Sequence, residues 1–343
     1  MNAADTASPA PAPLANGPAA AHSAPSGPAP AARHRWHDAL ARDEIRALVE
    51  MDDARSWRTL AVNWGLVFGA MAVVAAWPNP LTVVAALCVI GTRQLGLAVV
   101  MHEAAHRSFL SDKRWNDAVA SWLACYPVWS DLHAYRRYHM RHHARNWTED
   151  DPDIGLATPF PITRASFRRK VVRDLTGRTG AKFVRFAARR DLGTEGGLAA
   201  RLRRGLGNER FRGMLIANAT LLGLLALAGH AWLYLLWVGA YLTTNTLVTR
   251  IRAIAEHAMP IDPANPLQNT RTTIARWWER LLIAPNFVNY HLEHHLLMTV
   301  PHYNLPRMHA LLASRGVLDD ALVARGYLSV LREATSRAPG AAA

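Results

Sequence analysis

The sequence has very little cysteine and few acidic residues for its length. Only Cys88 and Cys125 occur among 343 residues, both within apolar stretches, which excludes a disulfide framework and a Cys-X-X-Cys zinc site. We interpret them as buried thiols. Asp and Glu number 26 against 39 Lys and Arg, so the formal net charge is +13. This excess favours anionic partners such as nucleic acid, acidic lipid or an acidic redox protein, although basic loops also commonly orient membrane proteins.

The first 33 residues lack the apolar content that a core requires. Residues 1–33 are almost entirely Ala, Pro, Ser, Gly and Asn, which predicts a disordered tail. They also lack the basic start and apolar block of a secretory signal, so we expect no cleavage. Residues 34–58 mix charged and apolar side chains and predict an amphipathic helix at a membrane surface. We interpret His34 and His37 in this segment as surface histidines, because no other ligand type lies near them.

Long apolar runs, by contrast, are present. They cover residues 59–77, 81–101, 213–229 and 231–248, and a membrane-crossing helix needs about 20 such residues. Very short links join the first two runs and the last two, which predicts two tight hairpins. The fold class we expect is an all-α integral membrane protein, with four transmembrane helices in two hairpins within one domain, residues 59–310. A helical tail ending in disorder, residues 311–343, follows.

Two further segments bear on the topology. Residues 116–129 are apolar but too short to span, which indicates a re-entrant or interfacial segment. Arginine is dense from 164 to 212, and about half of all Lys and Arg fall between 131 and 212. By the positive-inside rule, this part and both termini face the cytoplasm, and we expect a location in the inner membrane.

Two residues of the second apolar run stand out. Arg93 lies on the opposite side of its helix from His102, so we expect it to find a partner on another helix rather than at a metal. Gly91 lies on the same side as His102. A small residue there either leaves room for a chain-like substrate or permits close helix packing.

Histidines gather in three clusters at spacings of three and four. On a helix these spacings place the rings on one face, where they can bind a metal together. One such pair is a weak signal, but three clusters beside membrane segments and on one expected side of the bilayer predict a metal centre. The clustered residues are His102, His106, His139, His142, His143, His291, His294 and His295.

Other residues near the clusters are candidates for supporting roles. His257 follows the last apolar run and is a ninth candidate ligand, whereas His230 falls at the opposite turn and is excluded by position. The acidic run at 149–153 follows the second cluster. Its carboxylates are candidates for accepting the second ring N–H of histidine ligands, and a solvated turn closed by Pro152 explains them equally well.

In the order and composition of its histidine clusters, the sequence resembles the membrane fatty acid desaturase family. The resemblance rests on the boxes HEAAH at 102–106, HMRHH at 139–143 and HLEHH at 291–295, in this order and separated by the two hairpins. The resemblance covers about residues 59–310. Flanking sequence motifs also support it, namely GTRQL, AYRRYH, DDPD, RAIAEH, NYHLEHH and VPHYNLP. The resemblance implies a non-haem di-iron centre on a cytosolic helical cap, which activates O2 and removes two hydrogens from neighbouring carbons.

By the family pattern, the iron ligands are the eight clustered histidines and His257. Nine nitrogens exceed what one four-coordinate zinc can use, whereas two octahedral irons can use them all. Two positions depart from the pattern. Ala253 stands where acyl-CoA desaturases often have Asn, which puts an acyl-CoA substrate in doubt, and Leu297 and Met298 replace a familiar Phe and Pro, so the position of the double bond does not carry over.

The expected chemistry needs electrons that this sequence has no evident means to supply. It contains neither the HPGG signature of cytochrome b5 nor a dinucleotide-binding glycine pattern. A separate ferredoxin-type or cytochrome b5-type donor is implied, and the arginine-rich surface suits an acidic one. We expect no nucleic-acid partner.

The function we predict is O2-dependent desaturation of a fatty acyl or related lipid chain. A hydroxylase or ketolase of the same superfamily, acting on a lipid or a small amphipathic metabolite, is the main alternative. A zinc protease using His102, Glu103 and His106 leaves the other clusters unexplained. A histidine-rich metal sensor or carrier consumes no oxygen.

Overall fold

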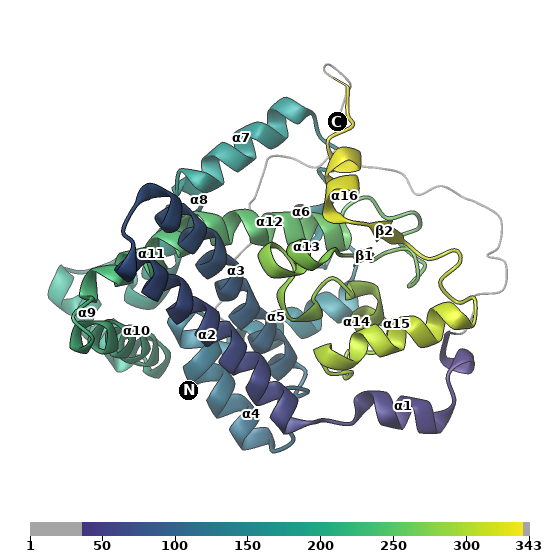
Figure 1. Cartoon of the computed structure of the whole chain (residues 1–343), viewed down its shortest axis with the longest axis horizontal. Coiled ribbons are helices and arrows are strands. Elements are labelled where there is room, and N and C mark those ends of the chain that lie inside the picture. Colours follow the sequence, from purple (N-terminus) through teal and green to yellow (C-terminus); the bar gives the residue numbers. More distant parts are fainter. Residues whose placement is uncertain (1–35, 339–343) are drawn as a thin grey trace, which may run out of the picture.

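The structure, a computed structural model, describes residues 36–338 and is mostly helical (Figure 1). The predicted disordered tail at 1–33, His34 and the end of the C-terminal tail lie outside the described residues. Within the described part, three helices are long and apolar enough to cross a membrane: α2 (Asp53–Ala76), α3 (Pro80–Ala105) and α10 (Glu209–Leu227).

Helices α2 and α3 pack side by side and form much of the main core (Figure 1). The side chain of Asp52 accepts the Arg55 N–H at 3.2 Å, so α2 begins at Asp53, earlier than the sequence predicts. Asn79 caps α3 by accepting the Leu81 N–H at 3.0 Å, with Pro80 in the first turn. These two caps fix the ends of the helices on either side of the short link.

The fourth apolar run is not one helix, which corrects the prediction of a single span at 231–248. It divides into η4 (Ala231–Leu233), α11 (Tyr234–Leu242) and α12 (Thr244–His257), with a break at Thr243, where φ is −119° and ψ is −85°. Threonine hydroxyls bond the backbone here. Thr243 donates to the Gly239 carbonyl at 2.6 Å, and Thr246 donates to the Thr243 carbonyl at 2.7 Å. Such local bonds compete with a continuous helix.

The short apolar segment after the first cluster is helical and partly buried. It consists of α4 (Lys113–Ala120), a π-helical turn η2 (Ser121–Cys125) and a 3-10 turn η3 (Tyr126–Val128), and it does not reach spanning length. The arginine-rich segment folds into three helices, α7 (Arg164–Leu175), α8 (Arg178–Leu192) and α9 (Leu198–Gly207).

The remaining elements form a cap around one end of α3. They are α5 (Leu132–Arg145), α6 (Ile154–Ala157), α13 (Trp277–Leu282), η5 (Pro285–Phe287), α14 (His291–Leu296), η6 (His302–Asn304), α15 (Leu305–Ser314) and α16 (Tyr327–Ala334). Strands β1 (Thr272–Ile274) and β2 (Val323–Arg325) pair in parallel, with Thr272 opposite Val323. The protein is therefore not purely helical.

The C-terminal segment is not a separate tail. Tyr327, Val330 and Ala334 of α16 are buried in one cluster with Ile254 and Ala255 of α12. The sequence gives no indication that α16 packs against α12. The pairing of β1 with β2, which joins the same two parts of the chain, has almost no local signal either, because each strand has only three residues.

Two smaller predictions are also wrong. Residues 34–58 do not form one helix, because η1 (Trp36–Ala39) and α1 (Arg42–Val49) end before α2 begins. An ion pair at 2.5 Å between Glu44 and Arg315 ties α1 to the residue that caps the end of α15. Cys125 is buried as predicted, but Cys88 is exposed on the outer side of α3.

Candidate metal centre

Four helices bring all nine predicted histidines together. His102 lies in the last turns of α3 and His106 caps its end; α5 and α14 each carry three of the nine, and α12 ends at His257. The Asp131 side chain fixes the start of α5 by accepting the Ala134 N–H at 2.7 Å. The spacing of three and four then turns the histidines of α5 to one side, toward the other three helices.

The nine rings form two separate groups, and in each group the ligand atoms lie within 4.8 Å of one another. The first group draws on α3, α5 and α14, and the second on α5, α12 and α14. Helices α5 and α14 therefore contribute to both. The first group is His102, His106, His139, His143 and His294, and the second is His142, His257, His291 and His295.

Distances between ring nitrogens suit a metal between them. The Nε2 of His143 lies 3.0 Å from the Nε2 of both His139 and His294, and the Nε2 of His291 lies 2.8 Å from that of His257 and 3.1 Å from that of His295. Imidazole-to-metal bonds are about 2.1 Å, so two ligands at right angles are about 3.0 Å apart. In a neutral imidazole, Nε2 either carries a proton and donates or presents a lone pair and accepts. The Nε2 of His143 or His291 therefore cannot donate to one neighbouring Nε2 and accept from the other.

Several buried ring nitrogens have no hydrogen-bond partner among the described residues. They include Nε2 of His102, both nitrogens of His106, and Nδ1 of His257 and His294. Leaving a buried polar atom unpaired costs about 1–3 kcal/mol, and such atoms in a native site need an explanation. A metal ion bound between the rings would explain each unpaired nitrogen that faces into its histidine group.

Burial keeps the imidazoles neutral. It lowers the pKa of His143 from 6.5 to about 2, and it lowers the pKa values of His139 and His257 well below 6.5, with repulsion from neighbouring histidines adding to the effect. A neutral imidazole keeps a free lone pair for a metal ion.

Carboxylates support three of the rings from outside the groups. Asp151 lies 2.8 Å from Nδ1 of His142 and is itself held by the N–H groups of Trp147 and Asp153, at 3.0 and 2.9 Å. This is one of the contacts that the acidic run suggested. Glu103 lies 3.3 Å from Nδ1 of His102, and Glu256 lies 3.6 Å from Nδ1 of His291. Such contacts fix the orientation of a ring and the nitrogen it presents.

Three polar residues at the site were missed by the sequence analysis. His302 presents its backbone N–H to Glu103 at 2.7 Å, and its Nε2 lies 2.9 Å from the Thr59 hydroxyl. Glu293 is fully buried inside the third box, and His309 lies 2.6 Å from it. The only available signal was the position of His302 and Glu293 within the flanking motifs.

Glu103 is not placed to act as a protease base. One of its oxygens contacts His102 and the other accepts the His302 N–H, so both are engaged in holding neighbouring groups. Together with two histidine groups instead of one, this geometry disfavours the zinc protease interpretation.

The remaining predicted residues lie away from the groups. Arg93 is buried and donates to the Leu281 carbonyl of α13 at 2.8 Å, so its partner is on another helix, as expected. Gly91 abuts the start of α12, where an added Cβ would lie 2.7 Å from the Asn245 nitrogen; close helix packing therefore explains it. His37 is exposed, and His230 belongs to neither histidine group.

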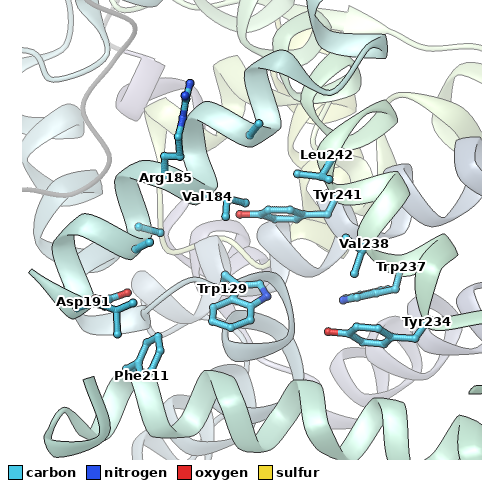
Figure 2. Close-up of a pocket in the computed structure, with 14 residues that line it drawn as sticks. Trp129, Val184, Arg185, Asp191, Phe211, Tyr234, Trp237, Val238, Tyr241 and Leu242 are labelled. Atoms are coloured by element: carbon cyan, nitrogen blue, oxygen red, sulfur yellow. The ribbon is translucent and has the colours of Figure 1, made fainter. Parts of the chain in front are cut away.

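A separate apolar cavity of about 590 Å³ lies between α8, α10 and α11 (Figure 2). Aromatic rings dominate its wall, among them Trp129, Phe211 and Trp237, while Arg185 extends away from them. Asp191 also lines it but is paired with Arg190 and Arg210, at 2.8 Å each. Trp129 lies three residues before the start of α5, and the helix rises about 10 Å between its first residue, Leu132, and His139.

Comparison with known proteins agrees with this geometry. The profile of the fatty acid desaturase family matches residues 78–325, and the chain belongs to that family. It is 29% identical over 259 residues to the dihydrorhizobitoxine desaturase of Bradyrhizobium elkanii, covering 72% of this chain and 68% of that one. It is 27% identical over 135 residues to the sn-1 oleoyl-lipid 12-desaturase of Picosynechococcus sp., covering 39% of this chain and 38% of that one.

Proposed function

We propose that the protein is an O2-dependent desaturase whose two histidine groups each hold one iron ion. The observation that carries this proposal is the division of nine buried or half-buried histidines into groups of five and four. Five nitrogens exceed the four-coordinate preference of zinc, and octahedral iron accommodates them. Iron, when bound, supplies the redox chemistry that O2 activation requires.

In the overall reaction we propose, a saturated carbon pair loses two hydrogens and becomes a double bond. Together with two electrons and two protons from outside, these hydrogens reduce one O2 to two water molecules. The protein's own residues hold the ligand rings in position through Asp151, Glu103 and Glu256. They also limit access of water, because five of the nine histidines are buried and the other four are half-buried.

The substrate we propose is a molecule with an apolar alkyl or acyl chain. The aromatic cavity supports this, because apolar walls and a volume of about 590 Å³ suit such a chain, and α5 leads from its wall to the histidines. The two relatives carry names with different substrates, one dihydrorhizobitoxine and one an oleoyl-lipid, so both a small amphipathic metabolite and a membrane lipid remain within the proposal.

We further propose that the histidine groups and both chain ends face the cytoplasm. The two long helices α2 and α3, joined by a short link, return the chain to the side where it started. Helix α10 carries the chain across the membrane a third time. The chain then returns to the same side only if the broken segment, α11 with α12, makes the fourth crossing. The arginines of α7, α8 and α9 support a cytoplasmic placement.

Product analysis tests the activity. In cells that express the wild-type protein, we expect lipids or metabolites that have lost two hydrogens, whereas His142→Ala abolishes them. His230→Ala, which removes a histidine outside both groups, keeps them. Products that gain an oxygen atom would instead show a hydroxylase, an alternative that the two desaturase relatives do not favour. Metal bound without O2 consumption would show a sensor or carrier.

A further inference from the structure

Of the four helices that carry the histidines, only α5 is exposed to solvent along its ligand-bearing part. Residues 99–105 of α3 are all buried, and residues 251–257 of α12 and 291–296 of α14 are buried or intermediate. The outer face of α5 is formed by exposed residues, which are Arg137, Met140, Arg141, Ala144 and Arg145. The ligand-bearing parts of the other three helices contain no exposed residue.

The outer face of α5 is cationic with an apolar centre. Its arginines are spaced by four residues and therefore align along the helix. Arg141 makes one exposed ion pair with Asp150, at 3.3 Å, while Arg137 and Arg145 form no ion pair within residues 36–338. Met140 lies between them with 38% of its surface exposed. A small apolar centre with a charged rim is the usual composition of a protein-protein contact.

The opposite face of the same helix reaches both metal groups. His139 and His143 belong to the first group, and His142 belongs to the second. A helix with its side chains is about 10 Å across, so a partner on the outer face is separated from both groups by one helix. Because electron transfer slows steeply with distance, this thin wall is the favourable place for electrons to enter.

We propose that the outer face of α5 is the docking site of an acidic one-electron carrier protein. The inference rests on the proposed function, in which two electrons from outside are consumed for each O2 reduced to water; the carrier delivers them singly and is oxidised twice per turnover. Complementary charge steers such encounters and raises their rate.

The larger arginine-rich surface on α7 to α9 suits a different partner. The exposed residues Leu198, Leu202 and Leu206 form an apolar row along α9, with 69%, 42% and 51% of their surfaces exposed. A row of leucines among arginines is typical of a helix in a lipid interface rather than of a transient protein contact. These helices also carry none of the histidines.

The test is electron delivery to charge-reversed variants of the iron-loaded full-length protein. The probe is a reduced plant-type [2Fe–2S] ferredoxin, which is acidic, and the readout is its rate of oxidation in the presence of O2 and lipid substrate. The variant is Arg137→Glu with Arg145→Glu, and the matched control is Arg203→Glu, an exposed arginine of α9. We expect the double variant to lower the second-order rate roughly 10-fold at low salt, and the control to leave it unchanged.

Salt and a chemical reductant complete the test. Raising ionic strength from about 0.05 M to about 0.5 M is expected to slow the wild-type protein and leave the double variant unaffected. Iron content and dithionite-driven product formation stay at wild-type levels in the double variant, so a failure of docking is distinguished from a failure of the proposed function. Wild-type rates in the double variant, an equal loss in Arg203→Glu, or a wild-type rate insensitive to salt would each overturn the proposal.

Discussion

Asp151 illustrates how much of the proposed metal centre depends on residues outside the two histidine groups. It is almost fully buried, contacts His142 and receives two backbone N–H groups that fix its position. A carboxylate held in this way selects which nitrogen of the ring faces the metal and strengthens that nitrogen as a ligand.

Replacing this carboxylate by an amide is expected to weaken iron binding. Asp151→Asn removes the negative charge beside His142 and should lower iron affinity about 10- to 100-fold. Iron retention against a graded chelator measures the change. The exposed neighbour Asp150 supplies the control, since Asp150→Asn should bind iron as the wild type does; equal retention in all three proteins would contradict the role given to Asp151.

The buried histidines make stability depend on pH in the metal-free protein. The folded pKa of His143 is about 2 and its ordinary value is 6.5, so between these values the unfolded chain binds the extra proton. Stability is therefore fully present above about pH 6.5 and declines as pH falls. Thermal unfolding of chelator-treated protein should show a falling midpoint below that pH. The iron-loaded protein should resist to lower pH, and a flat profile in the metal-free form would count against buried neutral imidazoles.

At the scale of elements, the sequence predicts which side chains share a face of one helix, but it does not predict which helices contact each other. Spacings of three and four identified the histidines of α3, α5 and α14 because the helix itself places those rings on one face. The break at Thr243 and the burial of α16 against α12 depend on partners distant in sequence. Hydropathy alone therefore predicted one span where the chain forms two helices.

The contact between α3 and α12 provides a test of this packing. In Gly91→Ala, the new methyl group meets the backbone of Asn245, and we expect a loss of about 1–3 kcal/mol in the free energy of unfolding. Gly65→Ala on α2 adds the same group where nothing lies within 4 Å, and it should be neutral or stabilising. Denaturation of the two variants in the same detergent measures the difference. Equal stability of both would show that the two helices do not approach closely at Gly91.

At the scale of the whole molecule, the protein combines three membrane-capable helices with a cap around one end of α3. The cap draws on segments from α5 to α16, so the histidine boxes are close in space only when elements from much of the described chain are folded together. The resemblance predicted the family and the metal centre without this knowledge. It did not predict the cavity, the small parallel sheet or the outer face of α5, because each depends on the side-by-side placement of distant segments.

The most direct measurement is the iron content of the purified full-length protein. The two histidine groups predict about two irons per chain in the wild type and fewer in His142→Ala, with His230→Ala unchanged. A single zinc ion per chain, or no iron after reconstitution with Fe²⁺, would contradict the account.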